Sequence, residues 1–249
     1  MNLNSILIGS ENPQGLADFY TKLFGWTTKD WDMGPAGIYK MFYAGEQALG
    51  GIAPLGGEQP VPSHWVCYVS VRSVDAAVER ALALGGGVRM PGTDIPDVGR
   101  FAMITDQAGA VIAPFTPKPG SEMPESADYP VGTFCWYELL AKDVATAAHF
   151  YTQVFGWTHR PEDMGQFGTY HLFRRGDQDI AGMMPKPADA AGPSQWLPYV
   201  RVGDVDASAA RFAELGGTVH VSPLDIPNVG RFAVGADPTG AMIALYKPK

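Results

Sequence analysis

Cysteine is scarce in this sequence, and long hydrophobic runs are absent. Only two cysteines occur, Cys67 and Cys135, both inside apolar strand-like stretches. Two such residues indicate reduced structural thiols in a reducing compartment, and they argue against a disulfide framework or a zinc site. The opening residues, MNLNSILIGSENP, contain no basic stretch, and their apolar run is too short for a signal peptide or a membrane span. We therefore expect a cytoplasmic protein.

Clustered positive charge is also missing. The formal net charge is -8, and no four basic residues follow one another. Nucleic acids and anionic membranes both require clustered Lys and Arg, so neither is expected as a partner. The sequence has no G-x-G-x-x-G or Walker loop after a strand, no G-x-S-x-G elbow and no suitably placed Cys-His pair. Nucleotide binding and acyl transfer are therefore not expected.

A long internal repeat is the main feature that is present. DIPDVGRFA at residues 94–102 returns as DIPNVGRFA at residues 225–233, and FYTKLFGWT at 19–27 returns as FYTQVFGWT at 150–158. Both pairs have the same spacing, and it is too long for one unit of a solenoid. Each copy is therefore predicted to be a domain, and 249 residues with 46% hydrophobic side chains can form two cores.

The join between the two copies is visible in the composition. TPKPGSEMPESADYP, residues 116–130, contains four prolines among polar residues, which is typical of an extended linker. We predict a first domain at residues 1–117, a linker at 118–130 and a second domain at 131–249.

Each copy itself contains a weaker internal repeat. In the first copy, residues 52–54 (IAP) correspond to residues 112–114 (IAP). Each half contains a short strand, a helix that ends at glycine, and three more strands. In the first half, Asn12 caps the helix and Gly25 ends it, and in the second half Ser73 caps the next helix. The predicted unit is βαβββ.

These motifs resemble those of a known superfamily. The helix ending in FYTKLFGW, the helix ending in LGG and the closing D-x-x-G-A strand are similar to the vicinal oxygen chelate superfamily. That superfamily includes glyoxalase I, extradiol dioxygenases and bleomycin-binding resistance proteins. The resemblance implies an α+β fold with two tandem domains, each made of two βαβββ units that form an open eight-stranded cup. The concave face of the cup holds the ligand.

Enzymes of that superfamily hold a divalent metal with four side chains, usually His, Glu or Gln, on the first and last strands of the half-units. The corresponding positions here carry no such ligand set: Ser5, Ala53, Val66 and Ala113 in the first copy, and Trp136, Met184, Leu197 and Ala244 in the second. Three or four ligands are the norm for catalytic sites. We expect no metal and no other cofactor, and a glyoxalase I reaction is not favoured.

Strand alternation predicts which side chains would face each cup. The second cup is expected to contain Trp136, Glu138, Gln195 and Tyr199, and the first His64 and Tyr68. His171 is a further candidate ligand-binding residue of the second cup. The first copy has Lys40 at the corresponding position, so the two cups differ there. Aromatic groups with a few polar ones are typical of a small-molecule pocket, and the larger polar set favours the second cup.

Glu138 is the candidate catalytic residue. A carboxylate on an apolar strand is desolvated and could act as a general base near neutrality. Alternatively, it pairs with Arg231 or a tyrosine hydroxyl and has a structural role. His64 is either a ligand-binding residue or an ordinary residue at a strand end.

Arg100 and Arg231 belong to the repeated nonapeptide. Each follows a glycine turn, where its guanidinium could bind loop carbonyls, Asp94 or Asp225, or hold an anionic ligand at the rim. The structural role is favoured, because both copies keep the whole turn while their cup residues differ.

We predict a metal-free protein that binds a small apolar or carbonyl-bearing metabolite. The alternatives are a metal-dependent lyase or dioxygenase-type enzyme, a hydroxylase-like auxiliary protein of secondary metabolism, and a scaffold with empty cups. The expected partner is a small molecule, and the chain is expected to be a monomer or a homodimer.

Overall fold

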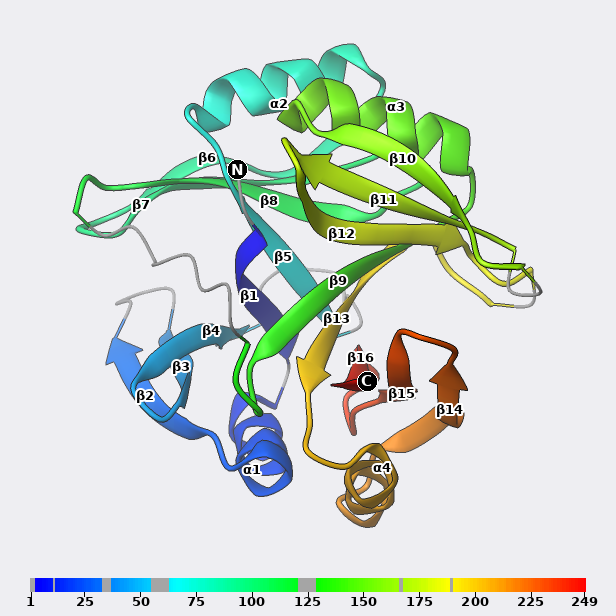
Figure 1. Cartoon of the computed structure of the whole chain (residues 1–249). Coiled ribbons are helices and arrows are strands. Elements are labelled where there is room, and N and C mark those ends of the chain that lie inside the picture. Colours follow the sequence, from blue (N-terminus) through cyan, green and yellow to red (C-terminus); the bar gives the residue numbers. More distant parts are fainter. Residues whose placement is uncertain are drawn as a thin grey trace. The chain divides into compact units, whose positions relative to one another are not determined.

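A computed structural model describes residues 3–10, 12–32, 37–54, 63–120, 129–165, 168–188 and 190–249 (Figure 1). The predicted linker falls partly outside this range, at residues 121–128. In the part of the chain that the structure covers, no helix is long and apolar enough to cross a membrane.

The first copy of the repeat forms an eight-stranded sheet. Its strands are β1 (Leu3–Ser10), β2 (Thr27–Asp32), β3 (Ile38–Ala44), β4 (Gln47–Pro54), β5 (His64–Ser70), β6 (Gly87–Ile95), β7 (Gly99–Thr105) and β8 (Val111–Pro117). Their order is β2-β3-β4-β1-β5-β8-β7-β6. β1 pairs with β4 and β5 pairs with β8 in parallel, whereas the hairpin partners are antiparallel.

The second copy repeats this arrangement strand for strand. Its strands are β9 (Phe134–Ala141), β10 (Thr158–Asp163), β11 (Thr169–Arg175), β12 (Gln178–Pro185), β13 (Gln195–Arg201), β14 (Thr218–Ile226), β15 (Gly230–Ala236) and β16 (Met242–Pro248). Their order is β10-β11-β12-β9-β13-β16-β15-β14. The expected α+β class, with two tandem eight-stranded sheets, is confirmed.

Each half-unit contributes one helix with local start and stop signals. The helices are α1 (Pro13–Phe24), α2 (Val74–Ala83), α3 (Val144–Phe155) and α4 (Val205–Glu214). Asn12 accepts a hydrogen bond from the amide of Gly15 at 3.0 Å, and Gly25 ends α1 in the left-handed conformation at φ 73°. Ser73 caps α2 in the same way. These features were expected from the sequence.

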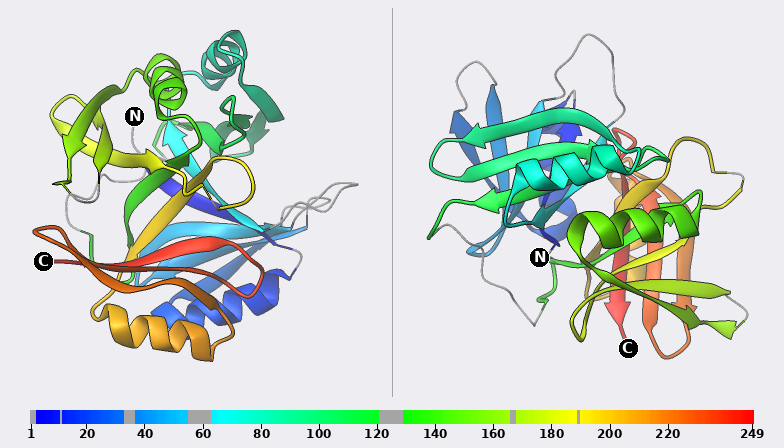
Figure 2. Two further views of the ribbon diagram at one scale, coloured as in Figure 1. Left: turned by 90° about the vertical axis from the view of Figure 1, so that its right-hand side faces the viewer. Right: turned by 90° about the horizontal axis from the view of Figure 1, so that it is seen from above.

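The folded chain divides into two compact units, and each unit combines parts of both copies. Unit 1 contains Met1–Ser5, Val66–Glu125 and Trp136–Trp196, and unit 2 contains Ile6–Trp65, Ser126–Cys135 and Leu197–Lys249. In unit 1, α2 and α3 lie side by side, and in unit 2, α1 and α4 do so (Figure 2). The second half of one copy therefore packs against the first half of the other.

A buried tyrosine–aspartate hydrogen bond joins the two copies within each unit. In unit 2, the hydroxyl of Tyr20 on α1 donates to Asp237 at 2.7 Å, and in unit 1 the hydroxyl of Tyr151 on α3 donates to Asp106 at 3.2 Å. Both tyrosines belong to the repeated aromatic segment, and both aspartates begin a D-x-x-G-A segment. The two motifs are thus structural partners across the repeat.

The repeated nonapeptide forms the turn between β6 and β7, and again between β14 and β15. Its one variable position is the residue with a left-handed backbone: Asp97 has φ 63° and Asn228 has φ 65°. Aspartate and asparagine tolerate this conformation better than other residues with a Cβ atom. The substitution between the copies is therefore conservative for the backbone.

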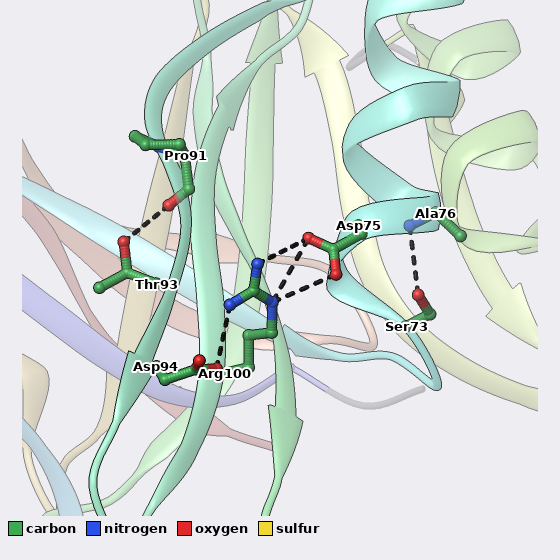
Figure 3. A network of polar contacts seen from close by, with 7 residues as sticks. All are labelled: Ser73, Asp75, Ala76, Pro91, Thr93, Asp94 and Arg100. Carbon is green, nitrogen blue, oxygen red and sulfur yellow. Dashed lines mark hydrogen bonds and ion pairs between the residues drawn. The ribbon is translucent and has the colours of Figure 1, made fainter.

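The arginine of the nonapeptide lies in an acidic cluster in each copy. Figure 3 shows the cluster around Arg100 in the first copy. Arg100 binds both carboxylate oxygens of Asp75, the closer at 2.9 Å, and also contacts Asp94 at 3.0 Å. Arg231 binds Asp206 at 2.7 Å and Asp225 at 3.1 Å. The aspartate partners in the helices explain why V-D-A recurs at the start of α2 and α4. These contacts support the structural interpretation, and anion binding by either arginine stays a prediction.

Replacing Arg231 by alanine should lower the thermal midpoint only modestly. The ion pairs are exposed at the surface, where water and salt weaken them. The decrease should therefore shrink in 0.5 M salt, which thermal denaturation of wild type and variant at two salt concentrations would show. Arg100→Ala is the matched variant in the first copy. If the variant instead lost ligand binding with unchanged stability, the result would support a role of Arg231 in holding an anionic ligand at the rim of the cup.

Candidate functional site

Three side chains on one face of β9 and β11 form a hydrogen-bonded relay in unit 1. The indole Nε1 of Trp136 donates to the hydroxyl of Tyr170 at 2.9 Å, and this hydroxyl donates to Oε2 of Glu138 at 2.8 Å. An indole nitrogen can only donate, so the direction of both hydrogen bonds is fixed. Glu138, which is 6% exposed, is the accepting end of the relay.

A glycine makes room for this relay. Gly182 on β12 stands opposite Glu138 on β9 and opposite Leu172 on β11. A Cβ atom at Gly182 would overlap the ring of Tyr170, so a side chain there would displace the tyrosine. The glycine therefore lets the phenol pass close to β12 and reach the carboxylate.

Tyr170 is the member of the relay that the sequence did not reveal. The repeat did contain a signal, because Tyr170 and Gly182 correspond to Tyr39 and Gly51, whereas the neighbouring His171 corresponds to Lys40. The tyrosine hydroxyl was foreseen only as one possible partner of Glu138. The hydrogen bond between a tyrosine hydroxyl and Glu138 is present in the structure. Arg231, the other possible partner, binds Asp206 and Asp225 instead.

His171 does not lie on the face of the relay, contrary to our expectation. It stands opposite Met183, which is fully buried, and two residues before Phe173, whose ring contacts Tyr151 of α3. Because successive side chains of a strand alternate, Tyr170 takes the relay face and His171 takes the face toward the helix.

Trp136 and Glu138 are brought together, but the structure does not show Gln195 or Tyr199 joining them. Gln195 is half-buried at the start of β13 in unit 1. Tyr199 belongs to unit 2, is 8% exposed, and packs its ring against Tyr246. Phe134, two residues before Trp136 on β9, packs against aromatic rings of unit 2.

The two candidates of the first copy lie in different units. His64 is half-buried at the start of β5 in unit 2. Tyr68 is half-buried in unit 1, with its ring near Phe101 and Phe115 at centroid distances of 6.0 Å. A binding role for either residue stays a prediction.

On the opposite face, His171 forms an imidazole pair with His159 of β10. Nε2 of His159 lies 2.8 Å from Nδ1 of His171, and both side chains are half-buried. Burial lowers the pKa of His159, and burial together with the nearby His159 lowers the pKa of His171. A hydrogen bond between two imidazoles requires at least one neutral ring, which fits these directions.

Acidification should weaken the fold through this pair. A histidine with a lowered pKa in the folded state binds protons more readily when unfolded, so its contribution is lost as pH falls below the ordinary value of 6.5. Thermal midpoints between pH 7.5 and pH 5 should fall less in His159→Gln than in wild type. His149→Gln, at an exposed position of α3, is the control and should behave as wild type. Equal pH dependence in all three proteins would contradict this assignment.

The positions that hold a metal in the superfamily it resembles do not provide suitable donors here. Val66, Ala113, Leu197 and Ala244 are buried hydrocarbon side chains, at most 2% exposed, and the indole of Trp136 uses its N–H to bind Tyr170. Divalent ions in enzymes require several oxygen, nitrogen or thiolate donors. Among the described residues, no group of three or more His, Cys, Asp or Glu could hold a metal ion. This donor set does not fit the superfamily's metal site, and the metal-free state stays a prediction.

Comparisons with known proteins agree with this fold. A model of the family described as "Glyoxalase/Bleomycin resistance protein/Dioxygenase superfamily" matches residues 2–113 and again residues 133–245. A protein of Mycobacterium tuberculosis (strain CDC 1551 / Oshkosh), whose name contains the words "glyoxylase CFP32", is 38% identical over 233 residues, which is 92% of this chain and 88% of the relative.

Two further similarities concern a biosynthetic protein and a solved structure. The "Anthracycline biosynthesis protein DnrV" of Streptomyces peucetius is 32% identical over 254 residues, covering 96% of this chain and 90% of the relative. The crystal structure of the Mn(II)-bound glyoxalase from Novosphingobium aromaticivorans has a TM-score of 0.65 at 15% identity, and the match covers 99% of this chain and 81% of that one. At that identity the structural likeness shows the fold alone.

Proposed function

The chain belongs to the glyoxalase/bleomycin resistance protein/dioxygenase superfamily, and from this premise we propose that it binds a small apolar or carbonyl-bearing metabolite beside the Trp136–Tyr170–Glu138 relay. The binding requires no resident metal. The ligand is either sequestered or transformed there, and Glu138 is the group that distinguishes the two cases.

The relay is the observation that carries the proposal. Trp136 and Tyr170 offer aromatic surface, and their hydrogen bonds hold a nearly buried carboxylate in one orientation. A preorganised acceptor beside aromatic rings suits a flat ligand that presents an O–H or an acidic C–H group.

The names of the relatives suggest the first probe. Two proteins about one-third identical over most of this chain are called anthracycline biosynthesis proteins. An anthracycline is polycyclic and aromatic, and it carries both carbonyl and phenolic groups. We therefore expect this class of molecule to bind beside Trp136, in line with a role as an auxiliary protein of secondary metabolism.

Fluorescence titration with an anthracycline tests the proposal. Binding should quench the protein's tryptophan emission, and Trp136→Phe should remove most of the quenching. Trp31→Phe, which removes an indole that is 53% exposed on β2, is the matched control and should leave the quenching in place. Absence of saturable quenching, or equal quenching in Trp136→Phe, would count against a site at the relay.

Metal content is measured on the same preparation. Protein purified without a histidine tag should contain well under one equivalent of iron, nickel, manganese or zinc and should bind the probe after treatment with a chelator. A stoichiometric metal whose removal abolishes binding would overturn the metal-free proposal and favour the lyase or dioxygenase alternative.

The remaining parts of the proposal concern partners and location. We expect a small molecule as the ligand and no nucleic acid, because the net charge is -8. Both cysteines are free thiols, which is in line with a cytoplasmic location. Each chain already contains two copies of the repeat, so a monomer or a homodimer is expected, and size-exclusion chromatography would distinguish them.

A further inference from the structure

The tyrosine-over-glycine arrangement of the relay occurs a second time, on β3 and β4 in unit 2. Tyr39 corresponds to Tyr170 in the repeat, and Gly51 corresponds to Gly182. A Cβ atom at Gly51 would overlap the ring and hydroxyl of Tyr39, as one at Gly182 would overlap Tyr170. Both copies therefore keep a phenol lying across a glycine of the adjacent strand.

The two phenols differ in the residue types at the corresponding positions of the neighbouring strand. Leu7 stands opposite Gly51 where Glu138 stands opposite Gly182, and Ser5 takes the place of Trp136 in the sequence. Tyr170 both accepts and donates a hydrogen bond. The hydroxyl of Tyr39 makes no hydrogen bond among the side chains that the structure describes, a set that leaves out those of β1. The first copy thus keeps the donor of the second and lacks its carboxylate acceptor.

The environment of Tyr39 keeps this donor neutral. The side chain is half-buried. Burial raises the pKa of its hydroxyl, and the neighbouring Tyr43 raises it further. A neutral phenol that is partly removed from water benefits from an acceptor such as a ketone oxygen, because an unmade hydrogen bond is costly for a desolvated donor.

From this contrast we propose that the β3–β4 face in unit 2 is a second small-molecule site, in which the hydroxyl of Tyr39 donates a hydrogen bond to the carbonyl oxygen of a neutral ligand. The two copies then select opposite chemistry. The Glu138 face accepts from a ligand that donates, and the Tyr39 face donates to a ligand that accepts. This inference is independent of what binds at the relay.

Matched ketones and hydrocarbons test this donor directly. The probes are acetophenone and 9-fluorenone, each compared with the counterpart that lacks the carbonyl, ethylbenzene and fluorene. Infrared spectroscopy should show the carbonyl stretch of a bound ketone at lower frequency, as hydrogen bonding requires. Tyr39→Phe should abolish this shift and weaken ketone binding about threefold to tenfold, while hydrocarbon binding stays unchanged.

Tyr129→Phe, which removes the hydroxyl of a tyrosine that is 39% exposed and precedes β9, is the control. It should leave the ketone-to-hydrocarbon affinity ratio and the infrared shift as in wild type, and circular dichroism should show both variants folded. The proposal is overturned if no ketone binds at millimolar concentration, if Tyr39→Phe leaves the ratio unchanged, or if Tyr129→Phe is the variant that changes it. Failure at the relay would appear separately, in the anthracycline titration of Trp136→Phe.

Discussion

Replacing Asp237 by alanine is expected to lower the free energy of unfolding by about 3–5 kcal/mol. The side chain is 4% exposed and accepts hydrogen bonds from the amides of Thr239 and Ala241, from the Thr239 hydroxyl and from the Tyr20 hydroxyl. Alanine would leave these donors without their acceptor, most of them away from water. The total free energy of unfolding of a protein is about 5–15 kcal/mol, so this loss would be a large part of it.

Urea denaturation followed by circular dichroism would measure this loss. Tyr20→Phe keeps the ring and removes only the hydroxyl, so it should cost less, about 1–2 kcal/mol. Asp225→Ala is the control for charge, because its side chain is 74% exposed and should have a minor effect. A change below about 0.5 kcal/mol in Asp237→Ala would show that the buried network is not needed for stability.

The corresponding Asp106 should behave in the same way in unit 1. It is 3% exposed and accepts from the amides of Ala108 and Ala110 and from the hydroxyl of Tyr151. Burial raises the pKa of Asp106 from its ordinary value of 3.8. The folded state therefore holds this proton more tightly than the unfolded state, and the stabilisation that protonation provides is lost as pH rises through the raised pKa.

Replacing Glu138 by glutamine should abolish proton transfer at the relay while leaving ligand binding within about threefold of wild type. General bases contribute about 100-fold to 10,000-fold to the rate of a reaction. Glutamine keeps the shape of the side chain and an oxygen that accepts from Tyr170, but it cannot take up a proton near neutral pH. In this variant, the affinity for the ligand is therefore expected to be retained while the rate of proton transfer is lost.

Hydrogen–deuterium exchange at carbon measures this step without knowledge of the natural substrate. Phenylacetone has acidic C–H bonds next to its carbonyl, and NMR in deuterated water would follow their exchange in the presence of the protein. Exchange should be accelerated by wild type and fall at least 100-fold in Glu138→Gln. Glu46→Gln, at an exposed turn between β3 and β4, is the control.

The opposite result would assign Glu138 a structural role. If wild type does not accelerate exchange and Glu138→Gln lowers the thermal midpoint by several degrees, the carboxylate only holds Trp136 and Tyr170 in place. The protein would then sequester its ligand without transforming it.

Local features of the fold could be predicted because their signals lie within a few residues. Asn12 before Pro13 marks the start of α1, and Gly25 supplies the left-handed residue that ends it. The aromatic residues of the repeated segment have the spacing of one helix face, which favours a place in the core, and Phe19, Tyr20, Phe150 and Tyr151 are buried. Each of these inferences needs only the periodicity of a helix or the backbone preference of one residue.

Contacts between the two copies could not be predicted in this way. Tyr20 and Asp237 are 217 residues apart, and neither motif indicates which aspartate would meet which helix. The position of Tyr170 in the relay was missed by one residue for a related reason. A shift of one residue along β11 exchanges the faces of a strand, so choosing His171 in place of Tyr170 selected the side toward α3.

The buried tyrosine–aspartate bonds have a consequence for any attempt to divide the chain. Residues 1–117 produced alone would contain the Tyr20 hydroxyl and the Asp106 carboxylate, each separated from the group that satisfies it here. Two such fragments could restore both bonds by associating, with each supplying the phenol that the other lacks. Halving the gene would thus be expected to yield a fragment dimer, and co-expressed halves should reassemble by complementation.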